Sequence, residues 1–235
     1  MTTRKRSLED FFDALRRNQR ANRTNFPQWY AIIERVDDCF VRVGKNLVNP
    51  EPPMTGVLLL RCQYAFKTAA GMALAGQIVE VFPILRSVLE YAGYCLLMYE
   101  TPALQGVFIL RHAGKPEMAT QKNEFTIKAV RGAITRHDPS VADIYDDNYQ
   151  RAIDFGAHPN PHGTFSAMSL DEDKGLDAIT ALAISKDPKI VEHALKCTAQ
   201  AGLTALHVLQ YVFKEKFELL GIRQDMDALA NTGML

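Results

Sequence analysis

The amino-acid sequence predicts a mainly α-helical protein, a single bundle of about seven helices. Apolar residues recur at steps of three and four through most of the chain, which is the period of an amphipathic helix. Prolines and capping residues divide these stretches into segments of helix length. The 235 residues are 47% hydrophobic, and 27 basic residues balance 27 acidic ones, so the chain can build an ordered core. We therefore expect one helical domain over 1–235.

The first 50 residues are expected to form a pair of helices. Ser7 followed by Asp10 is typical of a helix N-terminus, because the hydroxyl caps free backbone amides and the carboxylate favours the positive helix end. Pro27 suits the first turn of a second helix, whose apolar residues extend to Leu47. Three prolines within 49–53 then end that helix, since proline cannot donate a backbone hydrogen bond.

The segment 55–220 is expected to form the main body of the bundle. Its first part is almost wholly apolar, which predicts two buried central helices at about Thr55–Gly76 and Phe82–Tyr99. Shorter helices are expected at about Thr101–His112, at Glu117–Arg136 and from Asp138 to Arg151.

The later part of the chain departs from the helical pattern once. Residues 158–163 are rich in proline, glycine and histidine, which predicts a loop, and 164–185 is expected to form a small β-hairpin. A long helix follows from Asp187 to about Leu220, and 221–235 is expected to be a loosely held tail.

The composition also indicates where the protein resides. The longest stretch free of acidic residues, basic residues and histidine, Thr68–Val79, is shorter than the roughly 20 apolar residues of a membrane-spanning helix, and the basic N-terminus leads into charged residues. The four cysteines form no Cys-x-x-Cys pair and lie in apolar helical patterns, where a thiol acts as a small hydrophobe. We expect a cytoplasmic protein without contact to a membrane, with its cysteines in the core.

Common cofactor and hydrolase motifs are absent from the sequence. The segment Gly71–Ile78 has the glycine spacing of a phosphate-binding loop, but Gln77 stands where the lysine is needed. The chain has no Gly-x-Gly-x-x-Gly, His-Glu-x-x-His or Gly-x-Ser-x-Gly motif. The sequence therefore predicts no cofactor.

Arg86 and Glu90 form the first constellation with chemical potential. They are four residues apart in the most apolar part of the chain, so they share one helix face and can form an ion pair. Charge inside an apolar bundle must be satisfied, because an unpaired buried charge costs several kcal/mol. Two interpretations are open: a structural ion pair at the centre of the bundle, or a polar binding pocket.

Arg151 and His158 form the second constellation. They are seven residues apart, which on a continuous helix directs both side chains the same way. Arginine is a permanent cation and histidine titrates near neutrality, so the pair can hold a phosphate and move a proton. Asp154, His158 and His162 also offer metal donors, which leaves a metal-dependent hydrolase as an alternative.

The other histidines are interpreted as structural. His112 and His137 end predicted helices, where a cation complements the helix dipole. His193 lies four residues before Cys197 on the terminal helix, without a further donor near in sequence, and His207 follows on the same helix.

These two constellations together resemble the HEPN superfamily, in particular its poorly characterised bacterial branch. The resemblance rests on Arg86-Ser87-x-x-Glu90 and on the Arg-x6-His pattern that ends in His158-Pro159. Members are helical bundles, commonly dimers, and many are metal-independent ribonucleases. The resemblance implies that His158 transfers a proton at the ribose 2′-hydroxyl or the leaving oxygen and that Arg151 stabilises charge on the phosphate. Arg86, Glu90 and His162 would support binding.

Charge and surface composition bear on the partners. Residues 1–24 hold seven basic and three acidic side chains, whereas 138–192 holds eleven acidic and four basic ones, an unfavourable balance for RNA near Arg151. Apolar helical faces exceed what one small bundle needs, which predicts a homodimer. The expected partner of the polar site is RNA or a small anionic ligand. The alternative to a ribonuclease is a non-catalytic binding or interaction module of the same fold.

Overall fold

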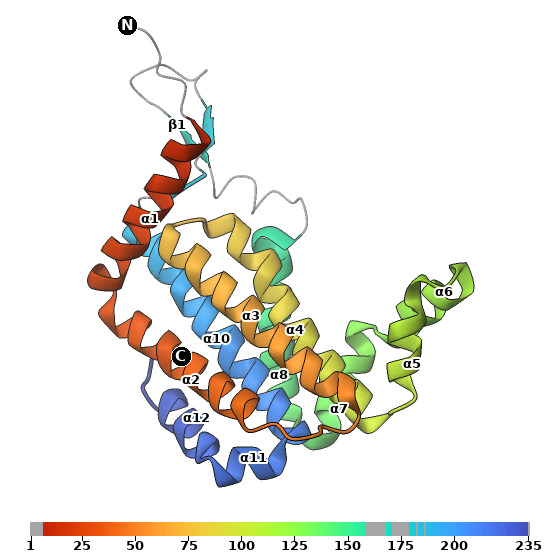
Figure 1. Ribbon diagram of the computed structural model, residues 1–235. Helices are drawn as coiled ribbons and strands as arrows, with labels where there is room; N and C mark the ends of the chain where they lie inside the picture. Colours follow the sequence, from red (N-terminus) through yellow and green to blue (C-terminus); the bar gives the residue numbers. More distant parts are fainter. Residues whose placement is uncertain (1–6, 158–167, 171–178, 182, 186, 235) are drawn as a thin grey trace, which may run out of the picture.

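The computed structural model describes residues 7–157, 168–170, 179–181, 183–185 and 187–234, and it shows a bundle of helices (Figure 1). The helices are α1 (Leu8–Asn25), α2 (Pro27–Lys45), α3 (Pro53–Ala75), α4 (Ile78–Glu100), α5 (Leu104–Ile109), η1 (Leu110–His112), α6 (Lys115–Glu124), α7 (Ile127–His137), α8 (Pro139–Ala152), η2 (Ile153–Ala157), α10 (Pro188–Val212), α11 (Lys214–Leu219) and α12 (Ile222–Ala230). The predicted mainly helical class is confirmed, and the described helices are more numerous than the seven or so expected.

The centre of the bundle consists of α3, α4 and α10, which pack along one another, with α2 against α3 and α10 (Figure 1). The two central apolar helices predicted from the sequence are α3 and α4. Gly76, at a φ of 82°, ends α3 in the left-handed region that glycine adopts without strain. All four cysteines are free and buried, as expected.

One described helix, α4, is long and apolar enough to cross a membrane by length and composition. The sequence prediction, which considered only charge-free stretches, did not include this helix. In the bundle, 61% of its most apolar window is buried against other helices. The same composition is found in the core helices of globular proteins.

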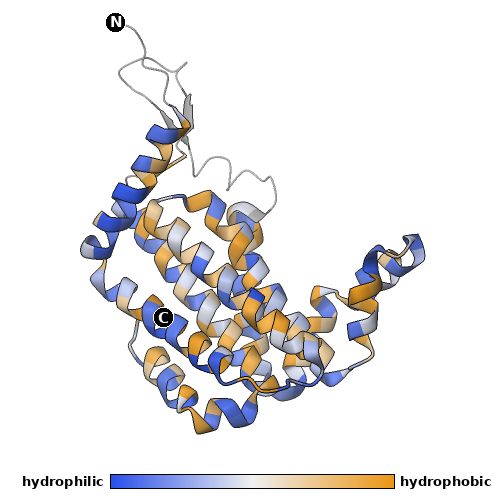
Figure 2. Ribbon diagram, in the orientation of Figure 1, coloured by the Kyte–Doolittle hydropathy of each residue, from blue (hydrophilic) through white to orange (hydrophobic). Residues whose placement is uncertain are grey.

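The first helix begins with the predicted cap. The Ser7 hydroxyl accepts a hydrogen bond from the Asp10 amide at 3.1 Å, and the Asp10 carboxylate accepts one from the Ser7 amide at 3.1 Å. No residue of α1 is buried, and Figure 2 shows the helix as largely hydrophilic. It is joined to α3 by polar contacts: the amides of Asn18, Gln19 and Asn22 donate to carbonyls in the last turns of α3.

The helix predicted over Glu117–Arg136 is divided in two. Thr126 interrupts it, because its hydroxyl accepts a hydrogen bond from the Ala129 amide at 3.1 Å and so caps a new helix, α7. The segment before it, α5, η1 and α6 (Leu104–Glu124), projects from the bundle, and we call it the arm (Figure 1).

The C-terminal region corrects two expectations. The predicted helix from Asp187 to Leu220 ends at Val212, and α11 follows after Phe213. The tail expected to be loosely held contains α12, whose Ile222, Met226 and Leu229 are buried. Arg42 of α2 ties this region to the bundle by an ion pair with Asp225 and a hydrogen bond to the Leu220 carbonyl at 2.8 Å. The short segment from Ile222 to Leu229 has an apolar face of its own, which was not predicted from the sequence.

Two three-residue strands, β1 (Met168–Leu170) and β2 (Ile179–Ala181), pair antiparallel with Met168 opposite Ala181. Both strands lie within the hairpin expected over 164–185, of which residues 164–167, 171–178 and 182 lie outside the described residues.

Candidate functional site

The predicted ion pair between Arg86 and Glu90 is present on α4, and a third side chain joins it. Arg86 Nε lies 2.8 Å from Glu90 Oε1. Tyr149 of α8 accepts from Arg86 Nε at 3.1 Å and donates its hydroxyl to Glu90 Oε1 at 3.0 Å. The guanidinium also lies 5.4 Å from the centre of the Tyr149 ring, a cation–π distance. The tyrosine therefore links α8 to both charges of α4.

These charges lie at the wall of the bundle and not at its centre. The side chains of Arg86 and Glu90 are each 27% exposed, which differs from an ion pair at the centre of the bundle, one of the two interpretations left open by the sequence. They line a cavity of about 240 Å³ together with Tyr149 and the aromatic residues Tyr94 and Phe125. A small hollow with one ion pair and aromatic walls has the composition of a ligand site.

The surroundings of this cavity change the pKa of its residues. Burial opposes the charge on Arg86, but Glu90 outweighs it and the pKa of the guanidinium is raised. Burial, reinforced by the Glu90 charge, raises the pKa of Tyr149, and burial raises the pKa of Tyr94 to about 12. Both phenols therefore remain protonated at neutral pH, where Tyr149 donates to Glu90 and Tyr94 donates to the Phe125 carbonyl at 3.3 Å.

Arg151 lies on another side of α8. Its position is two residues after Tyr149, which is about 200° around an α-helix. Tyr149 contacts α4, whereas Arg151 Nη1 donates to Gln200 Oε1 of α10 at 2.7 Å and to Asn148 Oδ1 at 3.3 Å. The described contacts thus place the two predicted arginines in different environments, one beside a carboxylate and one between neutral amides.

A histidine and a cysteine of α10 lie beside Arg151, although the sequence analysis interpreted both as structural. Cys197 Sγ is 3.5 Å from His193 Nε2, and the ring of Phe155 is 5.7 Å from that of His193. Burial and then the Arg151 charge lower the pKa of His193. Burial raises the pKa of Cys197, although Arg151 acts in the opposite direction, so the thiol stays protonated at neutral pH. Residues 193, 197 and 200 are spaced by four and three residues, so they share one face of α10. This spacing is the sequence feature that could have indicated that they lie together.

The segment after Arg151 changes its helical geometry. The α-helix ends at Ala152, and Ile153–Ala157 form a π-helical turn. The seven-residue spacing to position 158 therefore does not follow one continuous α-helix, which corrects the geometric basis of the Arg151–His158 prediction. Gly156 packs so closely against α4 that an added Cβ would lie 2.5 Å from the Val79 carbonyl oxygen. His158 and His162 themselves lie outside the described residues.

The described residues contain no group of three or more histidine, cysteine and acidic side chains placed to hold a metal ion, and Asp154 accepts a hydrogen bond from Gln150 at 2.8 Å. Comparison with protein families, with curated proteins and with solved structures finds no match to this chain.

Proposed function

We propose that this chain is a HEPN-like, metal-independent ribonuclease in which Arg151 stabilises the negative charge that develops on the scissile phosphate. The observation that carries the proposal is the pairing of Arg151 with two neutral amide oxygens, from Asn148 and Gln200. No carboxylate among the described residues forms an ion pair with this guanidinium, so its charge is not offset there. A cation held in place by neutral acceptors is suited to an anion.

We assign the proton transfer in this reaction to a histidine side chain. His158 would accept the proton of the ribose 2′-hydroxyl, whose oxygen attacks the adjacent phosphorus, or would protonate the departing 5′-oxygen. His193 is a second histidine beside the same arginine, and its lowered pKa leaves the ring neutral and able to accept a proton at pH 7. Neither role needs a metal ion.

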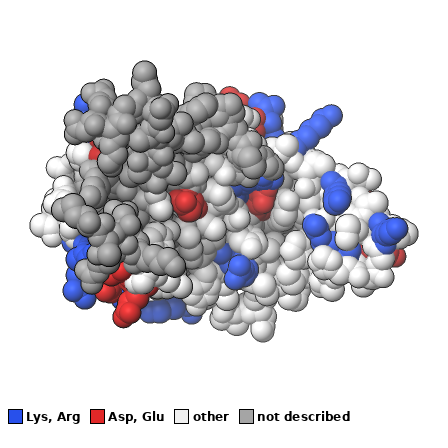
Figure 3. All heavy atoms as spheres, turned by 90° about the horizontal axis from the view of Figure 1, so that it is seen from above, with Lys and Arg blue, Asp and Glu red and all other residues white. Residues whose placement is uncertain are grey.

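RNA needs positive charge beyond Arg151. Figure 3 shows basic groups on the part of the surface that the arm occupies. Lys122 of the arm and Lys128 of α7 are exposed, whereas Arg131 and Arg136 are engaged in ion pairs with acidic residues. We therefore propose the arm and the start of α7 as the surface that receives the strand.

We also propose a homodimer, with α3 at the interface. Along one face of α3, Val57, Leu60 and Tyr64 are 49%, 42% and 59% exposed. The spacing of three and four residues places these side chains in one stripe, which we call the α3 stripe. A row of exposed large apolar side chains supports contact with a second copy of the chain.

A second function has its own supporting observation. Arg151 is not among the residues that line the cavity at Arg86, Glu90 and Tyr149, and the Arg86 guanidinium places a cation in its wall. If the chain does not cut RNA, this cavity supports a non-catalytic module that holds a small anionic ligand.

The deciding experiment is cleavage of RNA by the purified protein in the presence of a chelator. We expect the parent protein to cleave and Arg151→Ala and His158→Ala to lose cleavage while keeping the parent circular dichroism spectrum. Arg16→Ala is the control, because it removes an arginine from α1 whose side chain is 62% exposed. Unchanged cleavage in Arg151→Ala would overturn the assignment of that residue. A parent protein that does not cleave RNA would overturn the ribonuclease proposal and favour the non-catalytic binding module.

A further inference from the structure

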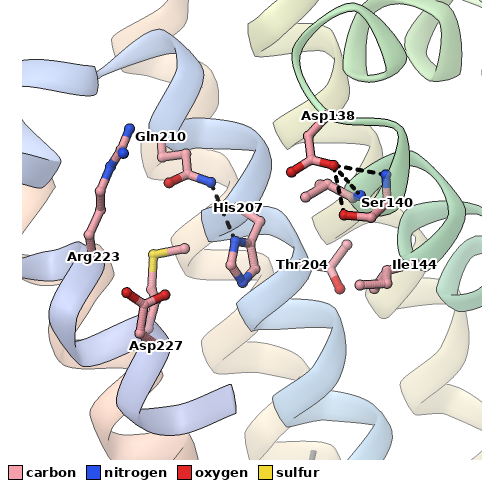
Figure 4. Close-up of a pocket in the computed structure, with 10 residues that line it drawn as sticks. Asp138, Ser140, Ile144, Thr204, His207, Gln210, Arg223 and Asp227 are labelled. Carbon is pink, nitrogen blue, oxygen red and sulfur yellow. Dashed lines mark hydrogen bonds between the residues drawn. The ribbon is translucent and has the colours of Figure 1, made fainter. Parts of the chain in front are cut away.

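A second cavity, of about 330 Å³, lies between the N-terminus of α8, the later part of α10 and α12 (Figure 4). Three separate helices contribute to it, and its walls contain both apolar and polar side chains. Val141, Ile144 and Met226 form the apolar part, and polar and charged side chains form the rest. Its volume is at the lower end of the range for ligand sites, which fits a small molecule. It shares no lining residue with the cavity at Arg86.

One carboxylate of the cavity is held in a fixed orientation. Asp138 is the N-cap of α8, and a single oxygen, Oδ1, accepts from the Ser140 amide at 2.8 Å, the Ser140 hydroxyl at 2.7 Å and the Val141 amide at 3.4 Å. Figure 4 shows the other oxygen directed away from these donors, toward Gln210 and His207. These hydrogen bonds lower the pKa of Asp138, so the group is ionised at neutral pH.

A second carboxylate faces the first across the cavity. Asp227 of α12 lies on the side of His207 opposite Asp138 (Figure 4), and the described hydrogen bonds do not include its carboxylate oxygens. The cationic side chain of the lining, Arg223, forms an ion pair with Glu218 at 3.1 Å. The net charge presented to a ligand is therefore negative.

His207 lines the same cavity as the two carboxylates, and the charges of both act on its ring. The Gln210 amide lies 3.3 Å from Nδ1, and an amide nitrogen can only donate, so we assign the ring hydrogen to Nε2. Burial lowers the pKa of His207, although Asp227 and Asp138 act in the opposite direction, so the ring is neutral at pH 7. The histidine thus leaves the charge of the two carboxylates uncompensated.

We propose that this cavity binds a small aliphatic amine, with its ammonium group between Asp138 and Asp227 and its alkyl chain against Ile144 and Met226. Two carboxylates on opposite walls complement one ammonium group, which has three donors. The apolar wall distinguishes an alkylammonium ion from an inorganic cation, because an inorganic ion gains nothing from contact with Ile144 and Met226.

Isothermal titration calorimetry of the full chain tests the proposal, with ethanolamine, putrescine and agmatine as probes. Butanol and inorganic phosphate serve as the neutral and anionic comparisons, for which we expect no heat of binding. Loss of one charged contact in Asp227→Asn is expected to weaken amine binding about tenfold or more. Asp138→Asn should act in the same direction while the amide side chain still caps α8.

Asp147→Asn is the matched control, because it removes the same charge from an exposed position of α8 outside the lining. Amine binding that is unchanged in Asp227→Asn, or equally weakened in Asp147→Asn, would overturn the assignment. So would the absence of binding by every amine at millimolar concentration. None of these outcomes depends on RNA cleavage, so the two proposals fail independently.

Discussion

The hydroxyl of Tyr149 lies between the two charges of α4, accepting from Arg86 Nε at 3.1 Å and donating to Glu90 Oε1 at 3.0 Å. One neutral side chain thereby orients an ion pair between two partly exposed residues of a single helix. The contact also connects α8 to α4 at the rim of the cavity. The integrity of that cavity is expected to depend on this oxygen atom.

Replacing Tyr149 by phenylalanine removes the hydroxyl and keeps the ring. We expect the free energy of unfolding to fall by about 1 kcal/mol, because two hydrogen bonds are lost at a partly exposed site. Urea denaturation measures the change. Tyr64→Phe is the control, since Tyr64 is 59% exposed on α3, and equal stability of the two variants would contradict the role given to Tyr149.

Acidification is expected to destabilise the fold through His207. Its pKa is lowered by burial in the folded chain, so below pH 6.5 the unfolded chain binds more protons than the folded one. Stability is therefore greatest above that value and decreases as the pH falls toward the folded pKa. Thermal melts between pH 7 and pH 5 should show a shallower slope for His207→Gln than for the parent. The exposed His112→Gln serves as the comparison, and an unchanged slope in His207→Gln would count against the inference.

At Gly202, α10 packs closely against α3 and α2. A Cβ at this position would lie 2.4 Å from a ring carbon of Phe66 and 2.8 Å from a methyl group of Val36. We expect Gly202→Ala to lower the free energy of unfolding by about 1–3 kcal/mol through overpacking. Gly106→Ala is the control, because an added Cβ there meets nothing within 4 Å. Chemical denaturation in parallel would reveal the difference, and equal effects would refute the close packing.

The α3 stripe gives the proposed dimer a direct test. A charge at Leu60 or Tyr64 cannot be buried without a partner, so Leu60→Arg and Tyr64→Arg are expected to convert a dimer into a monomer. Light scattering after size exclusion reports the mass. Leu219→Arg controls for a new surface charge, since Leu219 is 81% exposed on α11. A parent protein that is monomeric at micromolar concentration would exclude the dimer.

Local signals in the sequence were enough to predict much of the fold. The structure contains the Ser7–Asp10 cap, the helix that begins at Pro27 and the two central apolar helices. Each of these was predicted from residues that are close together in the sequence. The division at Thr126 and the packing of α12 were missed for a common reason. A hydroxyl in a helical pattern gives a weak cap signal, and a nine-residue helix gains most of its stability from the surface it packs against.

The candidate site was predictable only within one helix. Arg86 and Glu90 share a face of α4, so their pairing follows from the spacing. Tyr149 comes from α8, and Gln200, His193 and Cys197 come from α10, so their positions beside the two arginines depend on how the helices pack. Sequence spacing carries no information on which helix faces which. For the same reason, the cavity between α8, α10 and α12 could not be predicted from the sequence.

The attachment of α1 has a consequence for how the protein opens. Side-chain amides at positions 18, 19 and 22 hold the helix to the end of α3, and no side chain of α1 enters the core. Such a segment exchanges its contacts for water at little free-energy cost, so α1 can detach while the rest of the bundle stays folded. In native-state hydrogen exchange, the amides of α1 should lose protection as one cooperative group. That loss should precede the exchange of α3, α4 and α10.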